Sequence, residues 1–458
     1  MSGLEESLPR PLSVHSDDEK TVRGEPVDDA LRRKKDEEDG VNSEEQVETH
    51  EEAVASSVDP NSGFPEGGSK AWLIVFGAAL GNASTFGYVN AWGIFQTYYQ
   101  QTLLSHTSPS TIAWIGSIQY ALTFMPGLFV GQLFDRGYLK GPLFASSIGL
   151  VVSTLLVAQC TTYWQFLLCQ GFAVGLFSGL TFGPLVAVVA HWFRRRKGLA
   201  LGCLAFGSST GGVIFPIVVH NLIDSVGFKW TMRVVALILL CFLTVTFFTV
   251  ERRLPPKPDP GPLINVREFR SLTYSVYCLS GFVTFLGLYT MLTYINVSAE
   301  FVGIDAGFAV YLVSIGNAGS AAGRVVAGLL ADRWGPLNIM IPATLFAGIT
   351  TYIWPFIHTK ASYIVLGIIN GIFTGVYASM LTAPLLGMGQ TETVGLRVGM
   401  FFSILALGAL AGPPISGAIN DATGYKEVGY YAGSSILCAV ICLIVARHLI
   451  LRRLWGKA

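Results

Sequence analysis

The sequence predicts an all-α polytopic membrane protein with twelve transmembrane helices in two pseudo-symmetric halves of six. Three observations predict this class. Hydrophobic residues make up 51% of the chain and charged residues only 13%, too apolar a balance for a soluble protein of 458 residues. Twelve apolar runs follow Lys70, each close to the roughly 20 residues that cross a bilayer. A charged turn recurs at the end of the second and the eighth run.

Residues 1–68 are predicted to form a disordered, acidic tail. Nineteen of the thirty acidic residues precede Lys70, in a segment poor in apolar residues. Such a segment buries too little apolar surface to offset the entropy cost of ordering the chain. No apolar stretch of the signal-peptide kind follows Met1. Because most acidic residues lie in the tail, the rest of the chain is basic. The neutral total charge is the sum of these two parts and does not indicate nucleic-acid binding.

The twelve runs are predicted to be transmembrane helices, in order, over 71–95, 111–134, 142–160, 164–190, 198–221, 230–250, 272–297, 307–331, 337–357, 361–386, 396–419 and 428–450. Gly and Pro inside these runs are typical of bundled transmembrane helices, where small residues allow close approach. The seven cysteines lie in apolar runs without metal-ligand spacing. We expect no metal and no cofactor.

Lys and Arg gather in the loops that follow the even-numbered runs, with large groups in 194–197 and 252–270. By the positive-inside rule these loops and both termini are cytoplasmic. We expect the plasma membrane, with the vacuolar membrane as the alternative. The Pro-rich basic connector 252–270 separates an N-terminal half, 69–251, from a C-terminal half, 271–450, and a short basic tail follows at 451–458.

Two charged pairs are candidate gating residues. Asp135 and Arg136 end the second run, and Asp332 and Arg333 end the eighth. Each pair lies at the cytoplasmic end of a helix, where its members can bond to one another or to a neighbouring helix N-terminus. Because the turn recurs at equivalent places in both halves, we expect these residues to set an inward–outward equilibrium. The alternative is that they only end their helices in water.

Arg324 lies inside the eighth run. An arginine at membrane depth costs from roughly 2.5 to above 10 kcal/mol, so it faces a protein interior or a wet cavity. We expect Arg324 to bind substrate, with the capping of a neighbouring helix as the alternative. Asn90, Tyr289, Tyr294 and Asn317 are further candidates for the substrate site, with polar contacts between helices as the alternative role.

The doubled charged turn resembles the signature of the major facilitator superfamily. Several longer stretches resemble its monocarboxylate porter branch, especially the fungal members, among them 65–72, 193–202 and 394–400. The resemblance implies that superfamily's fold. It also implies that Arg324, which matches the span-eight arginine of these porters by position, binds the substrate carboxylate. Ser320 stands where well-studied animal members have an aspartate, and the first run lacks the lysine that those members use in proton coupling.

These observations favour a secondary active or facilitative transporter of a monocarboxylate-like organic anion that works by alternating access. Proton coupling stays open. The alternative within the same fold is an exporter of a fungal secondary metabolite, for which one cation and an aromatic, glycine-lined cavity suffice. A lesser alternative is a transporter-like nutrient receptor that signals through the acidic tail. The expected partners are an organic anion and the lipid bilayer. No nucleotide loop or catalytic triad occurs in the spans, so we expect no enzyme.

Overall fold

The computed structural model describes residues 67–193, 196–255, 263–389, 394–452 and 456, and only the backbone of Asp332 and Leu386. The chain separates into two units, Met1–Gly63 and Phe64–Ala458. The first unit lies outside the described residues, and so does nearly all of the tail predicted to be disordered. The described part of the second unit consists of helices joined by short turns, which confirms the predicted all-α class.

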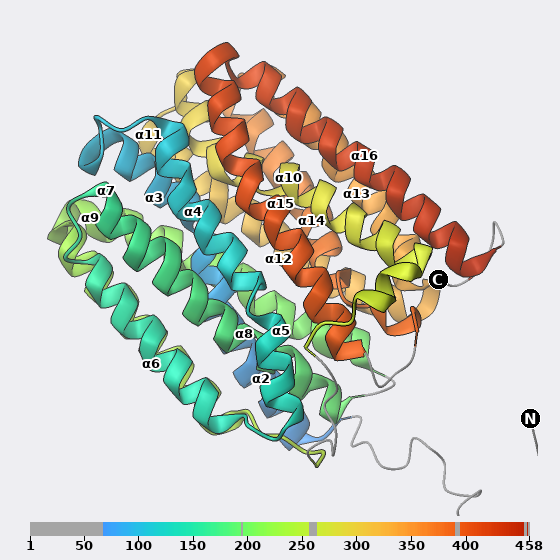
Figure 1. Cartoon of the computed structure of the whole chain (residues 1–458). Coiled ribbons are helices and arrows are strands. Elements are labelled where there is room, and N and C mark those ends of the chain that lie inside the picture. Colours follow the sequence, from blue (N-terminus) through green and yellow to red (C-terminus); the bar gives the residue numbers. More distant parts are fainter. Residues whose placement is uncertain (1–66, 194–195, 256–262, 390–393, 453–455, 457–458) are drawn as a thin grey trace, which may run out of the picture. The chain divides into compact units, whose positions relative to one another are not determined.

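The helices follow the predicted runs closely (Figure 1). Those before the connector are α2 (Ser69–Asn82), η1 (Ala83–Gly87), α3 (Trp92–Tyr98), η2 (Tyr99–Leu103), α4 (Pro109–Phe124), α5 (Gly127–Asp135), α6 (Lys140–Val157), α7 (Tyr163–Phe166), η3 (Leu167–Val174), α8 (Gly175–Trp192) and α9 (Lys197–Thr249). Those after its start are η4 (Val266–Arg270), α10 (Leu272–Phe301), α11 (Ala306–Ala309), α12 (Tyr311–Trp334), α13 (Pro336–Ile353), η5 (Trp354–Phe356), α14 (Lys360–Met380), η6 (Pro384–Gly387), α15 (Val394–Thr423) and α16 (Tyr425–Leu451).

Ten helices of the described chain are long and apolar enough to cross a membrane. Two further facts relate this number to the twelve predicted spans. Helix α9 contains the fifth and sixth spans, which meet at Gly227, where φ is +78°. Glycine adopts a positive φ at little cost, so the chain turns there without a loop. Helix α12 is the eighth span, a helix of 24 residues whose Asn, Ser, Arg and Gly residues reduce its apolar content.

The tenth predicted span ends earlier than expected. The apolar pattern continues to residue 386, but α14 ends at Met380 and the chain goes on as the short helix η6. Pro384 is a physical reason, because proline has no N–H with which to continue the helical hydrogen bonds.

The first span is interrupted in its middle. Helix α2 passes into the π-helical turn η1, and Asn90 and Ala91 form a turn before α3 begins. Their N–H groups bond to the carbonyl oxygens of Phe86 at 2.8 Å and Tyr88 at 3.1 Å. Irregular backbone at membrane depth is tolerated where it is buried in protein or lines a cavity. The interruption therefore marks Asn90 as an interior position.

The helices before the connector, blue to green, and those after it, yellow to red, lie on different sides in Figure 1. They meet in several contacts, among them those of α9 with α12, of α4 and α5 with α15, and of α3 with α10. In the contact of α9 with α12, a β-carbon at Gly202 would lie 3.1 Å from the carbonyl oxygen of Arg324. In the contact of α5 with α15, a β-carbon at Gly399 would lie 2.9 Å from Cα of Leu128. Small residues allow this close approach. The predicted boundary between two halves at the connector stays a proposal, and residues 256–262 of the connector lie outside the described ones.

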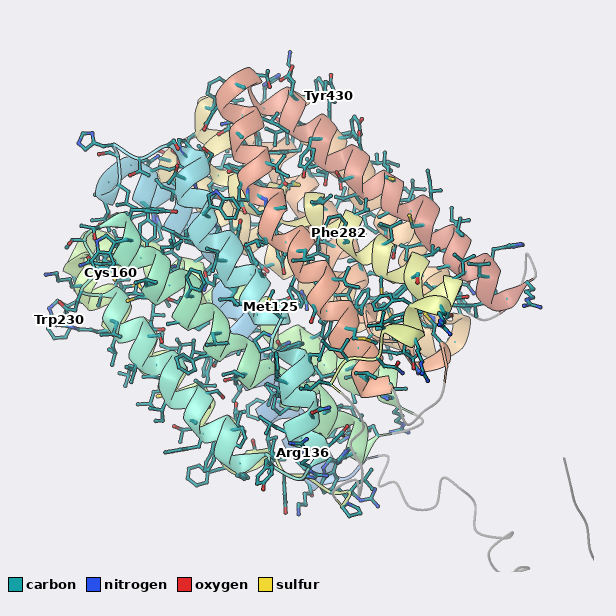
Figure 2. The ribbon with its side chains drawn as sticks, in the orientation of Figure 1. Met125, Arg136, Cys160, Trp230, Phe282 and Tyr430 are labelled. Atoms are coloured by element: carbon teal, nitrogen blue, oxygen red, sulfur yellow. The ribbon has the colours of Figure 1, made fainter. Side chains whose placement is uncertain are left out.

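Arg136 lies at one end of the helices, whereas Cys160, Trp230 and Tyr430 lie toward the other (Figure 2). At the Arg136 end, Lys70 and Glu251 form an ion pair of 2.8 Å. The assignment of this end to the cytoplasm stays a prediction from the distribution of basic residues.

Candidate functional site

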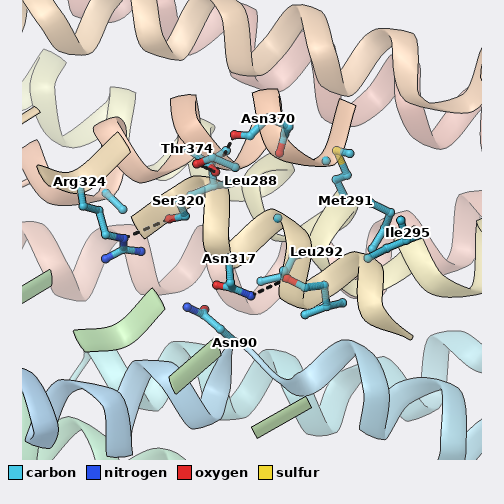
Figure 3. A pocket seen from close by; sticks show the side chains of 16 residues that line it. Asn90, Leu288, Met291, Leu292, Ile295, Asn317, Ser320, Arg324, Asn370 and Thr374 are labelled. Carbon is cyan, nitrogen blue, oxygen red and sulfur yellow. Dashed lines mark hydrogen bonds between the residues drawn. The ribbon is translucent and has the colours of Figure 1, made fainter. Parts of the chain in front are cut away.

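Two cavities, of about 90 and 100 Å³, adjoin in the middle of the bundle. Asn90 and Arg324 line both of them, Asn317 lines the first and Tyr289 lines the second. Figure 3 shows Asn90 pointing toward Asn317 from the opposite side of the first cavity. The structure thus brings together four of the five residues that the sequence proposes for the substrate site.

Arg324 is half-buried and held by neutral partners. Its Nε donates to Oγ of Ser320 at 3.1 Å, a bond visible in Figure 3, and its Nη1 donates to the carbonyl oxygen of Ala205 at 3.2 Å. The hydroxyl of Ser209 in turn donates to Oγ of Ser320 at 3.2 Å. These bonds orient the guanidinium beside both cavities but do not supply a negative charge. A guanidinium offers two parallel donors to a carboxylate, so the arrangement suits an anionic ligand.

Beside the cavities, α3 and α4 make close contacts with α10. The ring of Tyr120 stacks on that of Tyr289, with 3.8 Å between centroids and 13° between planes. A β-carbon at Gly93 would lie only 2.7 Å from the carbonyl oxygen of Leu292. Asn296 is fully buried, and neither polar atom of its amide has a hydrogen-bond partner in the described part of the chain. We call these residues, Gly93, Tyr120, Tyr289, Leu292 and Asn296, the seal.

Tyr294 is the one proposed site residue that lines neither cavity among those described. It is buried, and its hydroxyl donates to the carbonyl oxygen of Pro413 at 3.2 Å. The structure therefore places Tyr294 in the packing of α10 against α15, away from Arg324.

A third cavity, of about 370 Å³, lies toward the Arg136 end, and we call it the vestibule. Its walls include Gly131 and Phe182, and the charged side chains of Asp135 and Lys197 lie among the residues that line it. It shares five lining residues with the second central cavity, so the two adjoin: Phe182, Val186, Leu201, Thr382 and Phe402. The vestibule therefore leads from the Asp135 end toward Arg324.

The predicted gating residues occupy different surroundings. Asp135 lies near the first turn of α15, where a β-carbon at Gly395 would be 3.8 Å from its Oδ2. A carboxylate is favoured at a helix N-terminus by the aligned peptide dipoles. Arg136 and Arg333 are exposed. The side chain of Asp332 lies outside the described residues.

Several residues at these cavities were not among the sequence-based candidates. Ser320 precedes Arg324 by four positions, a spacing that brings side chains together on a helix, so the sequence held a signal for it. Ser209 belongs to α9, and no pattern in the sequence connects it to Arg324. Phe182 and Phe402 are also absent from the candidates, because an aromatic residue in an apolar run can equally face lipid.

Comparison with known proteins identifies the family. A family model described as Major Facilitator Superfamily matches residues 72–383 and 277–454. The chain is 37% identical to the MFS-type transporter dbaD of Emericella nidulans over 386 residues, which cover 83% of this chain and 87% of that protein. It is 34% identical to the aspyridones efflux protein apdF of the same organism, covering 82% and 77%. It is 36% identical to the MFS transporter asaE of Aspergillus flavus, covering 84% and 88%.

The crystal structure of the human organic anion transporter MFSD10 (TETRAN) has the same fold, with a TM-score of 0.62. The match covers 82% of this chain and all of that one, at 14% identity, and so bears on the fold alone. The three fungal relatives are transporters of the superfamily and not specifically monocarboxylate porters, so the resemblance to that branch holds only at the level of the superfamily. The chain belongs to the major facilitator superfamily and is a multi-pass membrane transporter, not an enzyme.

Proposed function

We propose that this transporter exports an organic acid of fungal secondary metabolism by alternating access. The observation that carries the proposal is the setting of Arg324, a guanidinium held by neutral groups at the meeting of two cavities. The relatives support export over uptake, because one of them is named an aspyridones efflux protein. The exporter alternative thus takes precedence over uptake of a small monocarboxylate.

The shape and lining of the cavities favour a substrate with one acid group and a larger apolar body. Arg324 binds the acid group, while Asn90 and Asn317 offer amide donors and acceptors in the same cavity. Phe182 and Phe402 form part of the wall between the second cavity and the vestibule. Aromatic side chains of this kind favour an apolar or aromatic body over a two- or three-carbon acid.

The arrangement of seal and vestibule supports an inward-facing state. If the Arg136 end is cytoplasmic, the vestibule admits substrate from the cytosol while the seal closes the outward path. Asp135, near the first turn of α15, is then the candidate that favours closure of the vestibule. Arg136, Asp332 and Arg333 are further candidates for setting the same equilibrium. A contact between a carboxylate and a helix N-terminus can form in one state of the carrier and break in the other. Such a contact is one way to set the inward–outward equilibrium.

Efflux from reconstituted vesicles tests the proposal. The vesicles are loaded with labelled acids that range from acetate to aromatic and polyketide acids, each paired with its neutral methyl ester. We expect efflux of the larger acids, no protein-dependent efflux of the esters, and loss of acid efflux in Arg324→Ala. Ser314→Ala is the matched control, because its Oγ also bonds to α9, at 3.3 Å from the carbonyl oxygen of Val213, away from Arg324.

Normal acid efflux by Arg324→Ala would exclude this residue as the ligand of the acid group. Proton-coupled uptake of a monocarboxylate is the second candidate, favoured by the stretches that resemble the porters. Acetate or lactate uptake that follows an imposed pH gradient, with no efflux of larger acids, would select it.

A further inference from the structure

The charge of the site leads to a prediction about what drives transport. None of the twelve predicted spans contains an Asp or Glu, and Arg324 lies farther from a span end than any other Lys or Arg within them. Arginine stays protonated in proteins, so its charge is present in every state of the carrier. The residues around it, Ser320, Ser209 and the carbonyl of Ala205, are neutral dipoles.

The polar groups of the two cavities extend the same pattern. Besides Arg324, the polar side chains that line the first cavity are amides and hydroxyls: Asn90, Asn317, Ser320, Asn370 and Thr374. In the second cavity they are again amides and hydroxyls, together with the phenol of Tyr289. Dipoles of this kind stabilise a buried cation without cancelling its charge. The empty site therefore carries one positive charge.

We propose that the bound anion is the counter-charge of this site, so that the loaded carrier is neutral at its centre and the empty carrier is positive. The change of the loaded carrier from the inward-facing to the outward-facing state is then insensitive to the membrane potential. Return of the empty site moves one positive charge inward, which a potential negative inside favours. Each cycle sends one negative charge out of the cell, and the potential drives export without a coupled proton. This inference rests on the proposed function for the sign of the substrate and the direction.

The charge of the empty carrier can be measured without any substrate. Cells that express the full chain are voltage-clamped, and the transient charge movement after voltage steps is divided by the amount of protein at the surface. We expect a saturable charge movement in the unmodified chain and a reduction of at least tenfold in Arg324→Gln. Arg324→Lys keeps the positive charge and should keep the charge movement.

Two further variants separate charge from structure. Ser320→Asp places a carboxylate next to the guanidinium, and we expect it to reduce the charge movement as strongly as Arg324→Gln, because the empty site becomes neutral. Ser314→Ala removes a hydrogen bond between the same two helices, α12 and α9, without changing the charge, and should leave the movement intact.

Absence of charge movement in the unmodified chain, or its persistence in both Arg324→Gln and Ser320→Asp, would overturn the inference. The outcome is distinguishable from that of the export test. If the charge movement depends on Arg324 but the vesicles release no acid, the proposed substrate is wrong and the charge of the carrier stands. If acids leave the vesicles but no charge moves, export holds and another driving force is needed.

Discussion

The seal and the vestibule both adjoin the central cavities, but the seal is tightly packed whereas the vestibule is itself a cavity. The seal consists of backbone contact at Gly93, ring stacking of Tyr120 on Tyr289, and a buried amide at Asn296 without a partner in the described chain. The vestibule is a cavity lined mainly by glycine, aliphatic and aromatic residues, with the charged side chains of Asp135 and Lys197 among them. Buried polar groups without partners cost free energy and are rare in permanent cores. We therefore predict that the seal opens during transport.

The largest effect is expected at the backbone contact of the seal. In Gly93→Ala the added β-carbon would lie 2.7 Å from the carbonyl oxygen of Leu292, so α3 and α10 must separate. Overpacking of this kind costs about 1–3 kcal/mol, or up to roughly 100-fold in the population of the sealed state. Hydrogen–deuterium exchange of the backbone over 92–98 and 289–296 should quicken accordingly.

Gly131→Ala is the matched control in the vestibule. Nothing lies within 4 Å of the position that its β-carbon would take. Exchange rates in this variant should equal those of the unmodified chain. If Gly93→Ala behaves in the same way, the backbone contact does not hold the seal closed.

The amide of Asn296 should make the seal weaker than an apolar residue would. Asn296→Leu removes a buried group without partners in the described chain and is expected to stabilise the inward-facing protein by about 1–2 kcal/mol. We expect a higher midpoint of thermal unfolding together with slower export, because the seal then opens less often.

Asn370 offers the opposite case on α14. Its Nδ2 donates to Oγ1 of Thr350 at 2.8 Å and to Oγ1 of Thr351 at 3.3 Å. Asn370→Leu should therefore lower the unfolding midpoint, at a cost of about 1–3 kcal/mol. If the unfolding midpoint rises in both Asn296→Leu and Asn370→Leu, the presence of hydrogen-bond partners does not distinguish these two amides.

On the vestibule side, Phe402→Ala tests the aromatic wall. Phe402 lines both the second cavity and the vestibule. Loss of an aromatic contact costs about 0.5–1.5 kcal/mol, so the apparent affinity for an aromatic acid should fall about threefold to tenfold. Competition against a labelled acid in the efflux assay measures this, with an alkyl acid of similar length as the reference. Phe248→Ala, at a side chain that is 77% exposed, should leave the apparent affinities for the aromatic and the alkyl acid unchanged.

The smallest effect is expected at the ion pair of the Arg136 end. The hydrogen bond and charge of Lys70 hold the pKa of Glu251 below its usual value. Because the pKa is lowered by folding, the stabilisation is present above the unfolded pKa of Glu and is lost as the pH falls through the folded pKa. Both side chains are more than half exposed, so Glu251→Gln should cost less than about 0.5 kcal/mol at pH 7.

Thermal unfolding at pH 7 and at about pH 4, near the usual pKa of Glu, measures this difference. The two proteins should become more alike at the lower pH. A large loss of stability in Glu251→Gln at pH 7 would show that the pair does more than an exposed ion pair can.

Most of the fold could be predicted because long apolar runs leave helices as the way to satisfy the backbone in a bilayer. Two local features differ from the prediction or were not predicted: where α14 ends and the interruption of the first span. The end of α14 is set by Pro384, which the apolar pattern hides. The interruption at Asn90 has no proline or glycine at its centre and follows from the packing of the first span against other helices.

The sequence by itself determined the class of the protein, the helical spans and the single cation at membrane depth, since each follows from composition along one run. Only the tertiary structure decided which polar residues meet that cation. Tyr289 and Tyr294 lie in the same run, yet the first lines a cavity and the second packs against α15. Five residues turn a helix by about 140°, and which face lines a cavity depends on helices far away in the sequence. The neutral setting of Arg324 likewise depends on α9, whose Ala205 and Ser209 no local pattern joins to it.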